Sequence, residues 1–317
     1  MRHFIFSMAF AFAGAGFSAE TEAFKKEGLT VQLASDVNAV VPGQKITVGF
    51  FIKHDPKYHT YWRSPGIVGV GSRLDWELPE GFKAGPIEWP APIRTKMAQI
   101  TAWGYESDTC LLSEIHVPKN VDGKSVTLKV KAAWMCCAAT CHPGWQDFEL
   151  TLPVSDSGEA ERDEKWAKMF AKTRAAFPKS SPENWNFSAK KTGEIMENVA
   201  EIEAVFSIPK TVEMPEDFDW NEVYFFCDDN QVNSDEPQGV RFDPDRPHTV
   251  YLKLIGTSYG PKNPESVSGI LFHPNGWPGL DTKWIEVSTP WADNDEQSQK
   301  RKEKKAKGEN QKRDRTG

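Results

Sequence analysis

The sequence predicts an all-β protein, in which a β-sandwich is followed by a second, mostly β region and a short helix joins the two. Three observations support this prediction. Short runs of alternating apolar and polar residues recur from about residue 28, turn-forming pairs separate them, and residues 160–177 instead show helix-like spacing. Evenly spaced short strands with turns between them are typical of β-sandwiches.

The predicted strands of the first region alternate with period two. The clearest are "LTVQLAS", "ITVGFFI" and "RLDWELP", at residues 29–35, 46–52 and 73–79. Successive side chains of a strand point to opposite faces, so each run places its apolar residues on one face. The turn-forming pairs between runs include Pro42-Gly43, Pro65-Gly66 and Asp122-Gly123.

The predicted helix rests on Trp166, Phe170 and Phe177, which are spaced among charged residues before Pro178 ends the pattern. We interpret it as a connection between two domains. Strands resume after it. Their sequences are "AEIEAVFSI", "EVYFFC", "HTVYLKLIG", "VSGILFH" and "KWIEVS". From Asn294 onward apolar residues nearly vanish, which predicts a charged disordered tail.

The N-terminus has the pattern of a secretory signal peptide. Arg2 and His3 precede an apolar run that ends near Phe12, and small residues follow up to Ala19. The run is short for a membrane anchor, which needs roughly 20 apolar residues. We expect the signal peptide to be removed, leaving a soluble periplasmic or otherwise exported protein with no transmembrane segment. The expected boundaries are 1–19 (signal peptide), 20–156 (β-sandwich), 157–184 (helical connector), 185–292 (second β-rich domain) and 293–317 (tail).

The overall charge argues against one class of partner. The formal net charge is −7 and the sequence pI is near 5.6. A nucleic-acid-binding protein normally carries a basic stripe on its folded part. We therefore expect proteins or small molecules as partners, and no nucleic acid.

Three of the five cysteines cluster in "CCAATC", residues 136–141. Alternating runs flank this cluster on both sides, which predicts a hairpin with the cysteines at its open end. In extended strand, four residues span roughly 13 Å, whereas a disulfide needs Cα atoms about 4.4 to 6.8 Å apart. Cys137 and Cys141 can therefore pair only if the chain turns between them, which Ala138-Ala139-Thr140 permits. If the strand persists that far, Cys136 points to the opposite face.

The residues alone leave three interpretations of the cluster open. A disulfide that closes so small a loop stabilises a fold weakly but serves well as a redox switch. The adjacent His142, when protonated, would lower a thiol pKa. A static disulfide is the second interpretation. A copper or zinc site with Cys136, Cys137, Cys141 and His142 as ligands is the third. We expect Cys110 and Cys227 to be buried, unreactive side chains.

Three stretches, taken in order, carry a resemblance to a known family. They are "HTYWRSPGIVGVGSRLDWELPEGFKAGPIEWPAPIR", "AWGYESDTCLLSEIHVP" and "KAAWMCCAATCHPG". Together they resemble the N-terminal periplasmic domain of the DsbD family of thiol:disulfide interchange proteins, especially its ScsB-like branch. The likeness covers roughly residues 28–155 and extends more loosely into the second β region.

The resemblance implies an immunoglobulin-like β-sandwich that passes electrons through a cysteine pair and needs no cofactor. By motif the pair is Cys137 and Cys141, with Cys141 as the nucleophile and Cys137 as its resolving partner. The implied partners are a membrane-embedded thiol reductant and exported client proteins that carry disulfides. Family members usually continue into transmembrane and thioredoxin-like domains, which this sequence lacks, so the reductant is expected to be a separate protein.

The family also covers its cysteines with an aromatic cap loop, which here corresponds to "AWGYESD". This nominates Trp103 and Tyr105 as shields, with Glu106 and Asp108 as nearby acids. His59, Tyr61 and Trp62 are further candidates for the lining of the site, and the alternative is that they merely end a strand. An equally good interpretation is that Trp103 and Tyr105 are core aromatics. An alternative for the whole domain is a non-catalytic protein-binding module.

Overall fold

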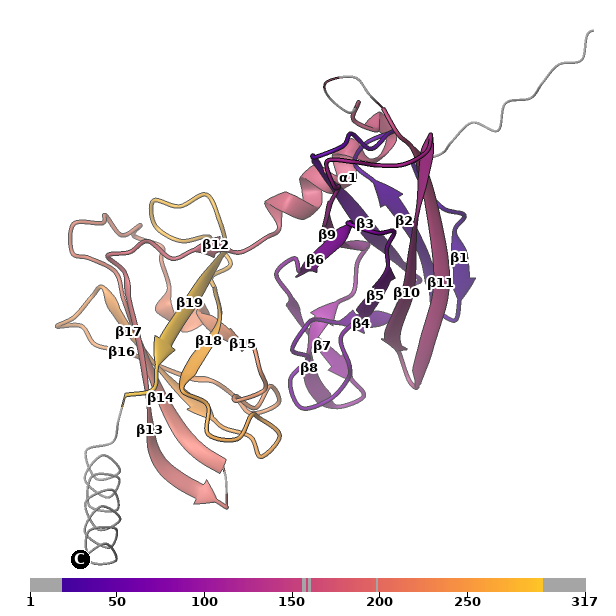
Figure 1. Cartoon of the computed structure of the whole chain (residues 1–317). Helices are drawn as coiled ribbons and strands as arrows, with labels where there is room; N and C mark the ends of the chain where they lie inside the picture. Colours follow the sequence, from indigo (N-terminus) through magenta and orange to yellow (C-terminus); the bar gives the residue numbers. More distant parts are fainter. Residues whose placement is uncertain (1–18, 156–157, 159–160, 198, 293–317) are drawn as a thin grey trace, which may run out of the picture.

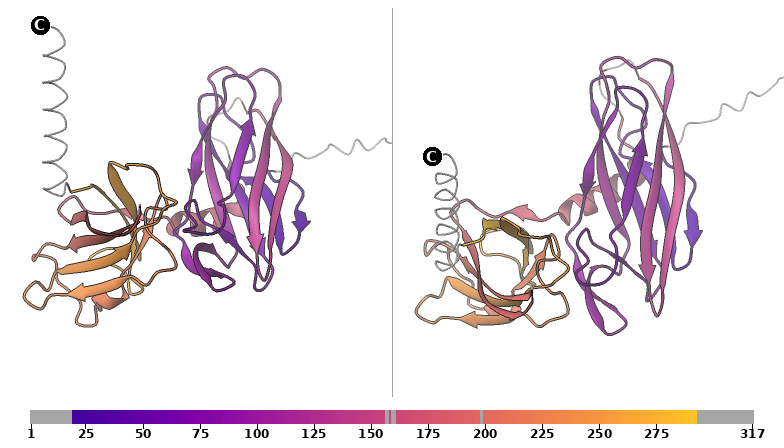
Figure 2. Two further views of the ribbon diagram at one scale, coloured as in Figure 1. Left: turned by 90° about the horizontal axis from the view of Figure 1, so that it is seen from below. Right: turned by 60° about the horizontal axis from the view of Figure 1, so that its bottom comes forward.

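The computed structural model describes residues 19–155, 158, 161–197 and 199–292. Most of the predicted signal peptide and all of the predicted tail lie outside these residues. The described chain forms two lobes that lie side by side in every view (Figures 1 and 2). Within the described ranges, no helix combines the length and apolarity needed to cross a membrane.

The first lobe, which we call the N-terminal sandwich, is an immunoglobulin-like pair of antiparallel sheets. In spatial order, the first sheet contains β1 (Phe24–Lys26), β2 (Leu29–Ser35), β3 (Lys45–His54), β9 (Thr109–His116) and β6 (Lys83–Glu88). The second contains β11 (Cys141–Pro153), β10 (Ser125–Cys137), β4 (His59–Tyr61), β8 (Ile100–Tyr105) and β7 (Ile93–Met97), with β5 (Arg73–Glu77) paired to β10.

The second lobe, which we call the C-terminal sandwich, also consists of two sheets. One contains β12 (Lys179–Ser180), β19 (Trp284–Pro290), β18 (Ser266–Phe272) and β15 (Tyr224–Cys227). The other contains β13 (Asn186–Met196), β14 (Val199–Ser207), β17 (Thr249–Ile255) and β16 (Gly239–Phe242). A short 3₁₀ helix, Trp220–Glu222, precedes β15. The all-β prediction is thus confirmed.

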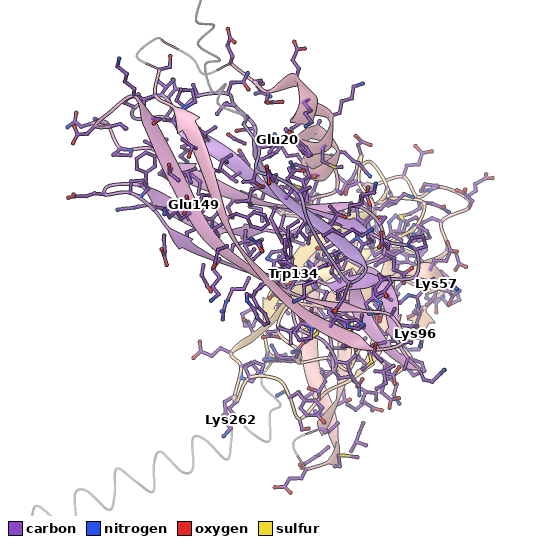
Figure 3. All side chains as sticks on the ribbon, turned by 90° about the vertical axis from the view of Figure 1, so that its right-hand side faces the viewer. Glu20, Lys57, Lys96, Trp134, Glu149 and Lys262 are labelled. Carbon is purple, nitrogen blue, oxygen red and sulfur yellow. A yellow bond between two sulfur atoms is a disulfide. The ribbon has the colours of Figure 1, made fainter. Side chains whose placement is uncertain are left out.

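The predicted alternation sets which side chains form the core. In β2, Leu29, Val31 and Leu33 are fully buried, as their spacing predicts. Trp134 of β10, labelled in Figure 3, is buried and packs against Phe50 of β3, which joins the two sheets. The run at residues 73–79 contributes less, because its apolar side chains are only half-buried at the edge of the core.

The helix α1 (Glu164–Ala175) does more than connect the lobes. Asp163 caps its N-terminus by accepting hydrogen bonds from the backbone N–H groups of Lys165 and Trp166. Phe170 is buried on the outer face of the first sheet, beside Phe51 and Cys110. The helix therefore covers a sheet face of the N-terminal sandwich, as Figure 1 shows.

We predict that Gly104→Ala destabilises the fold, because β8 and β4 approach closely at this residue. A Cβ atom at Gly104 would lie 2.0 Å from the carbonyl oxygen of Thr60. Overpacking of this kind costs about 1–3 kcal/mol, measurable by urea denaturation. Gly193→Ala is the matched control, because no atom lies within 4 Å of a Cβ built there. Equal midpoints for the two variants would show that β8 and β4 can separate at Gly104 without cost, contrary to this prediction.

Candidate redox-active disulfide site

The β10–β11 hairpin places the two cysteines directly opposite each other. Cys137 is the last residue of β10, Cys141 is the first of β11, and their Cα atoms are 4.1 Å apart. A disulfide joins them. The chain turns through residues 138–140, where the N–H of Ala138 donates to the carbonyl oxygen of Thr140 at 3.0 Å. The bond joins the pair that the spacing of the sequence favours.

The two cysteines of the bond differ in exposure. Cys137 is 0% exposed, whereas Cys141 is an exposed residue. Cys137 shares a small buried cluster with side chains that we call the cysteine cover. Its members are Tyr61, Ala102, Val68, Met97 and Met135. A thiol arriving from solution therefore meets Cys141 first.

A buried tyrosine and a buried histidine lie next to the sulfur of the exposed residue Cys141. The hydroxyl oxygen of Tyr61 lies 3.9 Å from Sγ of Cys141 and 3.3 Å from Nε2 of His59. Burial raises the pKa of Tyr61 to about 12, so its hydroxyl keeps its proton at neutral pH. Burial lowers the pKa of His59, and the charge of Glu106 partly opposes this shift. The tyrosine hydroxyl can therefore donate a hydrogen bond to a Cys141 thiolate while it accepts one from His59.

Cys136 lies on the other face of the hairpin. Its side chain belongs to the main core with Trp134, away from the disulfide. Burial, followed by the charges of Asp55 and Glu27, raises its pKa to about 12. Its thiol therefore keeps its proton at neutral pH.

The metal alternative has no support in the described part of the chain. No cluster of three or more His, Cys, Asp or Glu side chains there could hold a metal ion. His142 uses both ring nitrogens elsewhere: Nδ1 lies 3.1 Å from Glu27 and Nε2 lies 2.9 Å from Thr140. With Cys137 and Cys141 bonded to each other and Cys136 buried, the proposed ligands do not converge.

The aromatic residues expected to shield the disulfide lie in the core. Trp103 is 0% exposed, and its indole N–H donates to the hydroxyl of Tyr224 in the C-terminal sandwich at 3.2 Å. The hydroxyl of Tyr105 donates to the carbonyl oxygen of Pro90 at 2.7 Å. Trp62 is likewise buried. From this stretch it is Ala102 that shares a buried cluster with Tyr61 and Cys137.

The two predicted acids, Glu106 and Asp108, form hydrogen bonds with residues near the site and not with the disulfide. Glu106 accepts a hydrogen bond from Thr95 at 2.7 Å. Asp108 accepts one from the backbone N–H of His54 at 3.4 Å. His54 contacts Thr60 in turn, and burial lowers its pKa to about 4. Both carboxylates thus influence the histidines beside β4.

Sequence reasoning missed four members of the cysteine cover, namely Val68, Ala102, Met97 and Met135. One signal was available for Ala102, because strand alternation places it on the opposite face from Trp103. The remaining two cysteines match expectation. Cys110 and Cys227 are buried and unpaired, and burial raises the pKa of each thiol.

The comparisons with known proteins agree with this geometry. The model of the family "Thiol:disulfide interchange protein DsbD, N-terminal" matches residues 25–153. These residues form a DsbD-family N-terminal domain. The match spans β2 to β11 and therefore includes both cysteines of the disulfide. None of the curated proteins compared with this chain matches it.

Solved structures extend the likeness beyond the DsbD N-terminal domain. The N-terminal periplasmic domain of ScsB from Proteus mirabilis is 15% identical, with a TM-score of 0.61 over 87% of this chain and 100% of its own. That coverage includes both sandwiches, so the two-lobed fold is shared. A conserved domain protein from Bacillus anthracis is 10% identical over 88% of this chain and 92% of its own, and its TM-score of 0.23 is too low to show a shared fold.

We predict that the Cys136 thiol does not react with alkylating agents in the folded protein. With a pKa of about 12, its thiolate fraction near pH 8 is on the order of 10⁻⁴. Iodoacetamide should therefore leave Cys136 unlabelled until denaturant is added, as mass spectrometry can measure. Cys136→Ala should leave the reduction midpoint of the disulfide unchanged, and a shifted midpoint would show that Cys136 takes part in the exchange.

Proposed function

We propose that the DsbD N-terminal domain of this chain exchanges thiols and disulfides through Cys137 and Cys141, passing electrons from a membrane-embedded reductant to exported proteins. The observation that carries the proposal is the asymmetry of the disulfide, with one cysteine exposed and the other buried. A structural disulfide gains nothing from an exposed sulfur, whereas an exchanging one must present a sulfur to its partner. Family membership supports the same chemistry.

Reduction of the domain starts at Cys141. A thiolate of the reductant attacks Sγ of Cys141, the bond to Cys137 breaks, and Cys137 leaves as a thiolate that takes up a proton. A second thiolate of the reductant then attacks the reductant's own sulfur in the mixed disulfide and releases the Cys141 thiolate. Two electrons have then passed to the domain, and the reductant carries a disulfide.

Reduction of the client follows the same atoms. The Cys141 thiolate attacks a client disulfide, which releases one client thiolate and forms a mixed disulfide. Cys137 loses its proton and attacks Sγ of Cys141, and the second client thiolate leaves. The Cys137–Cys141 bond is restored, and the client holds two thiols.

Cys141 is thus the sulfur that the reductant attacks, the thiolate that the reductant later releases, and the nucleophile that attacks the client. The Tyr61 hydroxyl, backed by His59, is the donor that lies beside its sulfur. Hydrogen bonds to a charged group favour the charged form and lower a thiol pKa. We assign Tyr61 to thiolate stabilisation and His59 to the orientation of Tyr61.

The expected location follows from this chemistry. Disulfides persist in exported compartments, where a reducing domain must draw electrons from across the membrane. We therefore place the protein in the periplasm or an equivalent exported compartment, with its reductant in the membrane. Its clients are proteins whose disulfides are accessible in that compartment.

Trapping of mixed disulfides tests the proposal. Cys137→Ser leaves the exposed Cys141 without its resolving partner, so a disulfide-bearing model peptide should accumulate as a covalent adduct, seen by non-reducing electrophoresis and mass spectrometry. Cys141→Ser leaves only the buried Cys137 and is the matched control. We expect at least about tenfold less adduct with it, because access controls thiol reactivity. Equal trapping by both variants, or by neither, contradicts the proposed exchange.

We also predict that Tyr61→Phe raises the pKa of the Cys141 thiol. A hydrogen bond to a charged group contributes about 1.5–3 kcal/mol, and at this long distance we expect a rise of about 0.5–1 pKa unit. The pH dependence of Cys141 alkylation in the reduced protein measures it. Tyr58→Phe is the control, since the Tyr58 ring lies beside His142. A pKa that is the same in both variants would remove Tyr61 from the mechanism.

A further inference from the structure

The two sandwiches meet at segments that also build the cysteine cover. Strand β8 pairs with β4, which in turn pairs with β10 at Cys137. Thus Tyr61 and Ala102, the fully buried members of the cover, come from β4 and β8. Both strands continue directly into residues that contact the C-terminal sandwich.

Strand β8 is held on either side of Ala102. Thr101 donates its backbone N–H to Oδ1 of Asp235 at 2.8 Å and accepts a hydrogen bond from the hydroxyl of Ser234 at 2.7 Å. Trp103 packs its ring against Phe226, with ring centres 5.7 Å apart, in addition to its hydrogen bond to Tyr224. Ala102 thus sits between two anchored residues, in the same buried cluster as Tyr61 and Cys137.

The loop that follows Tyr61 is held in the same way. Arg63 contacts Oδ1 of Asp228 through both Nε at 3.1 Å and Nη2 at 2.5 Å. Both side chains of this pair are about one-third exposed or less (31% and 26%), so the pair is shielded from water more than a surface ion pair.

Two further contacts hold this loop. The hydroxyl of Ser64 donates to the side-chain oxygen of Asn230 at 2.8 Å, and the backbone N–H of Ile67 donates to the hydroxyl of Ser234 at 3.1 Å. Gly66 lies so close to Ser234 that a Cβ there would be 2.1 Å from its hydroxyl oxygen. The whole loop is therefore fitted to the C-terminal sandwich.

We propose that the C-terminal sandwich is a positioning element for the redox site, which holds β8 and residues 62–67 so that the cysteine cover stays closed over Cys137 and exchange is confined to Cys141. A reagent reaches Cys137 only when the cover opens locally. Displacing β8 breaks the contacts to the C-terminal sandwich, and so those contacts raise the free energy of opening. The inference rests on the proposed exchange, to which it adds a role for the C-terminal sandwich.

The test compares alkylation rates in the reduced, full-length protein. Arg63→Asp and Asp228→Arg each break the ion pair, and the double variant restores it with reversed sense. We expect each single variant to speed the reaction of iodoacetamide with Cys137 by roughly tenfold through easier local opening. The double variant should return to within about twofold of the original rate, as coupled sites do in a double-mutant cycle.

Two internal controls separate local opening from unfolding. Cys110 is buried in the N-terminal sandwich away from the disulfide, and its rate should not change. Exchanging the charges of the exposed Lys129–Glu149 pair should change neither rate; the pair lies on the β10–β11 hairpin, where Figure 3 labels Glu149. Ser234→Ala is a milder variant that removes only a hydroxyl, and it should speed Cys137 alkylation by about threefold.

The outcomes are distinct. A faster reaction at Cys137 with an unchanged rate at Cys110 supports the proposal. An unchanged Cys137 rate in Arg63→Asp and Ser234→Ala alike overturns it, as does a parallel rise at Cys110 in both variants. Because iodoacetamide needs neither reductant nor client, the outcome does not depend on mixed-disulfide trapping, and failure of one proposal is distinguishable from failure of the other.

Discussion

The register of the β10–β11 hairpin is the constraint on which the rest of the site depends. Because side chains alternate along a strand, the register that pairs Cys137 with Cys141 also turns Cys136 into the core. A slip of one residue would exchange these faces. The long, regular ladder of this hairpin, from Ser125 opposite Pro153 to the disulfide, fixes the register. This register thus separates the disulfide-bonded pair from the buried free thiol.

Chemistry at the disulfide depends on a difference between two environments a few ångströms apart. Cys141 faces solvent with a tyrosine hydroxyl beside its sulfur, and Cys137 lies under apolar side chains. Burial disfavours a thiolate, and a hydrogen-bond donor favours it. In the strand order β10–β4–β8, the cysteine-bearing strand β10 is followed by β4 and β8. The loop after β4 and strand β8 itself contact the C-terminal sandwich. The two lobes are therefore in contact through the segments that lie next to the disulfide.

Local sequence patterns predicted much of this arrangement, because the spacing of apolar residues reflects the repeat of a strand or a helix. The alternation of apolar and polar residues predicted the strands, and helix-like spacing predicted α1. The turn between Cys137 and Cys141 was predicted because a disulfide requires a short distance between their Cα atoms. The misplaced features depend on long-range packing. Trp103 was expected either over the disulfide or in the core, and it lies in the core against the C-terminal sandwich. Strand alternation predicts that two neighbouring side chains point to opposite faces, but it does not predict which segment covers each face. The sequence pattern did not predict the packing of α1 on β3 and β9 for the same reason.

A redox titration of the full chain against glutathione or dithiothreitol, with alkylation and mass spectrometry to identify the cysteines, tests the exchange mechanism most directly. We expect Cys137 and Cys141 to change together and reversibly, with a potential above roughly −300 mV, the level below which structural disulfides lie. Cys110, Cys136 and Cys227 should stay reduced throughout. A Cys137–Cys141 bond that opens only when the protein unfolds would contradict the exchange mechanism and leave a static disulfide in its place.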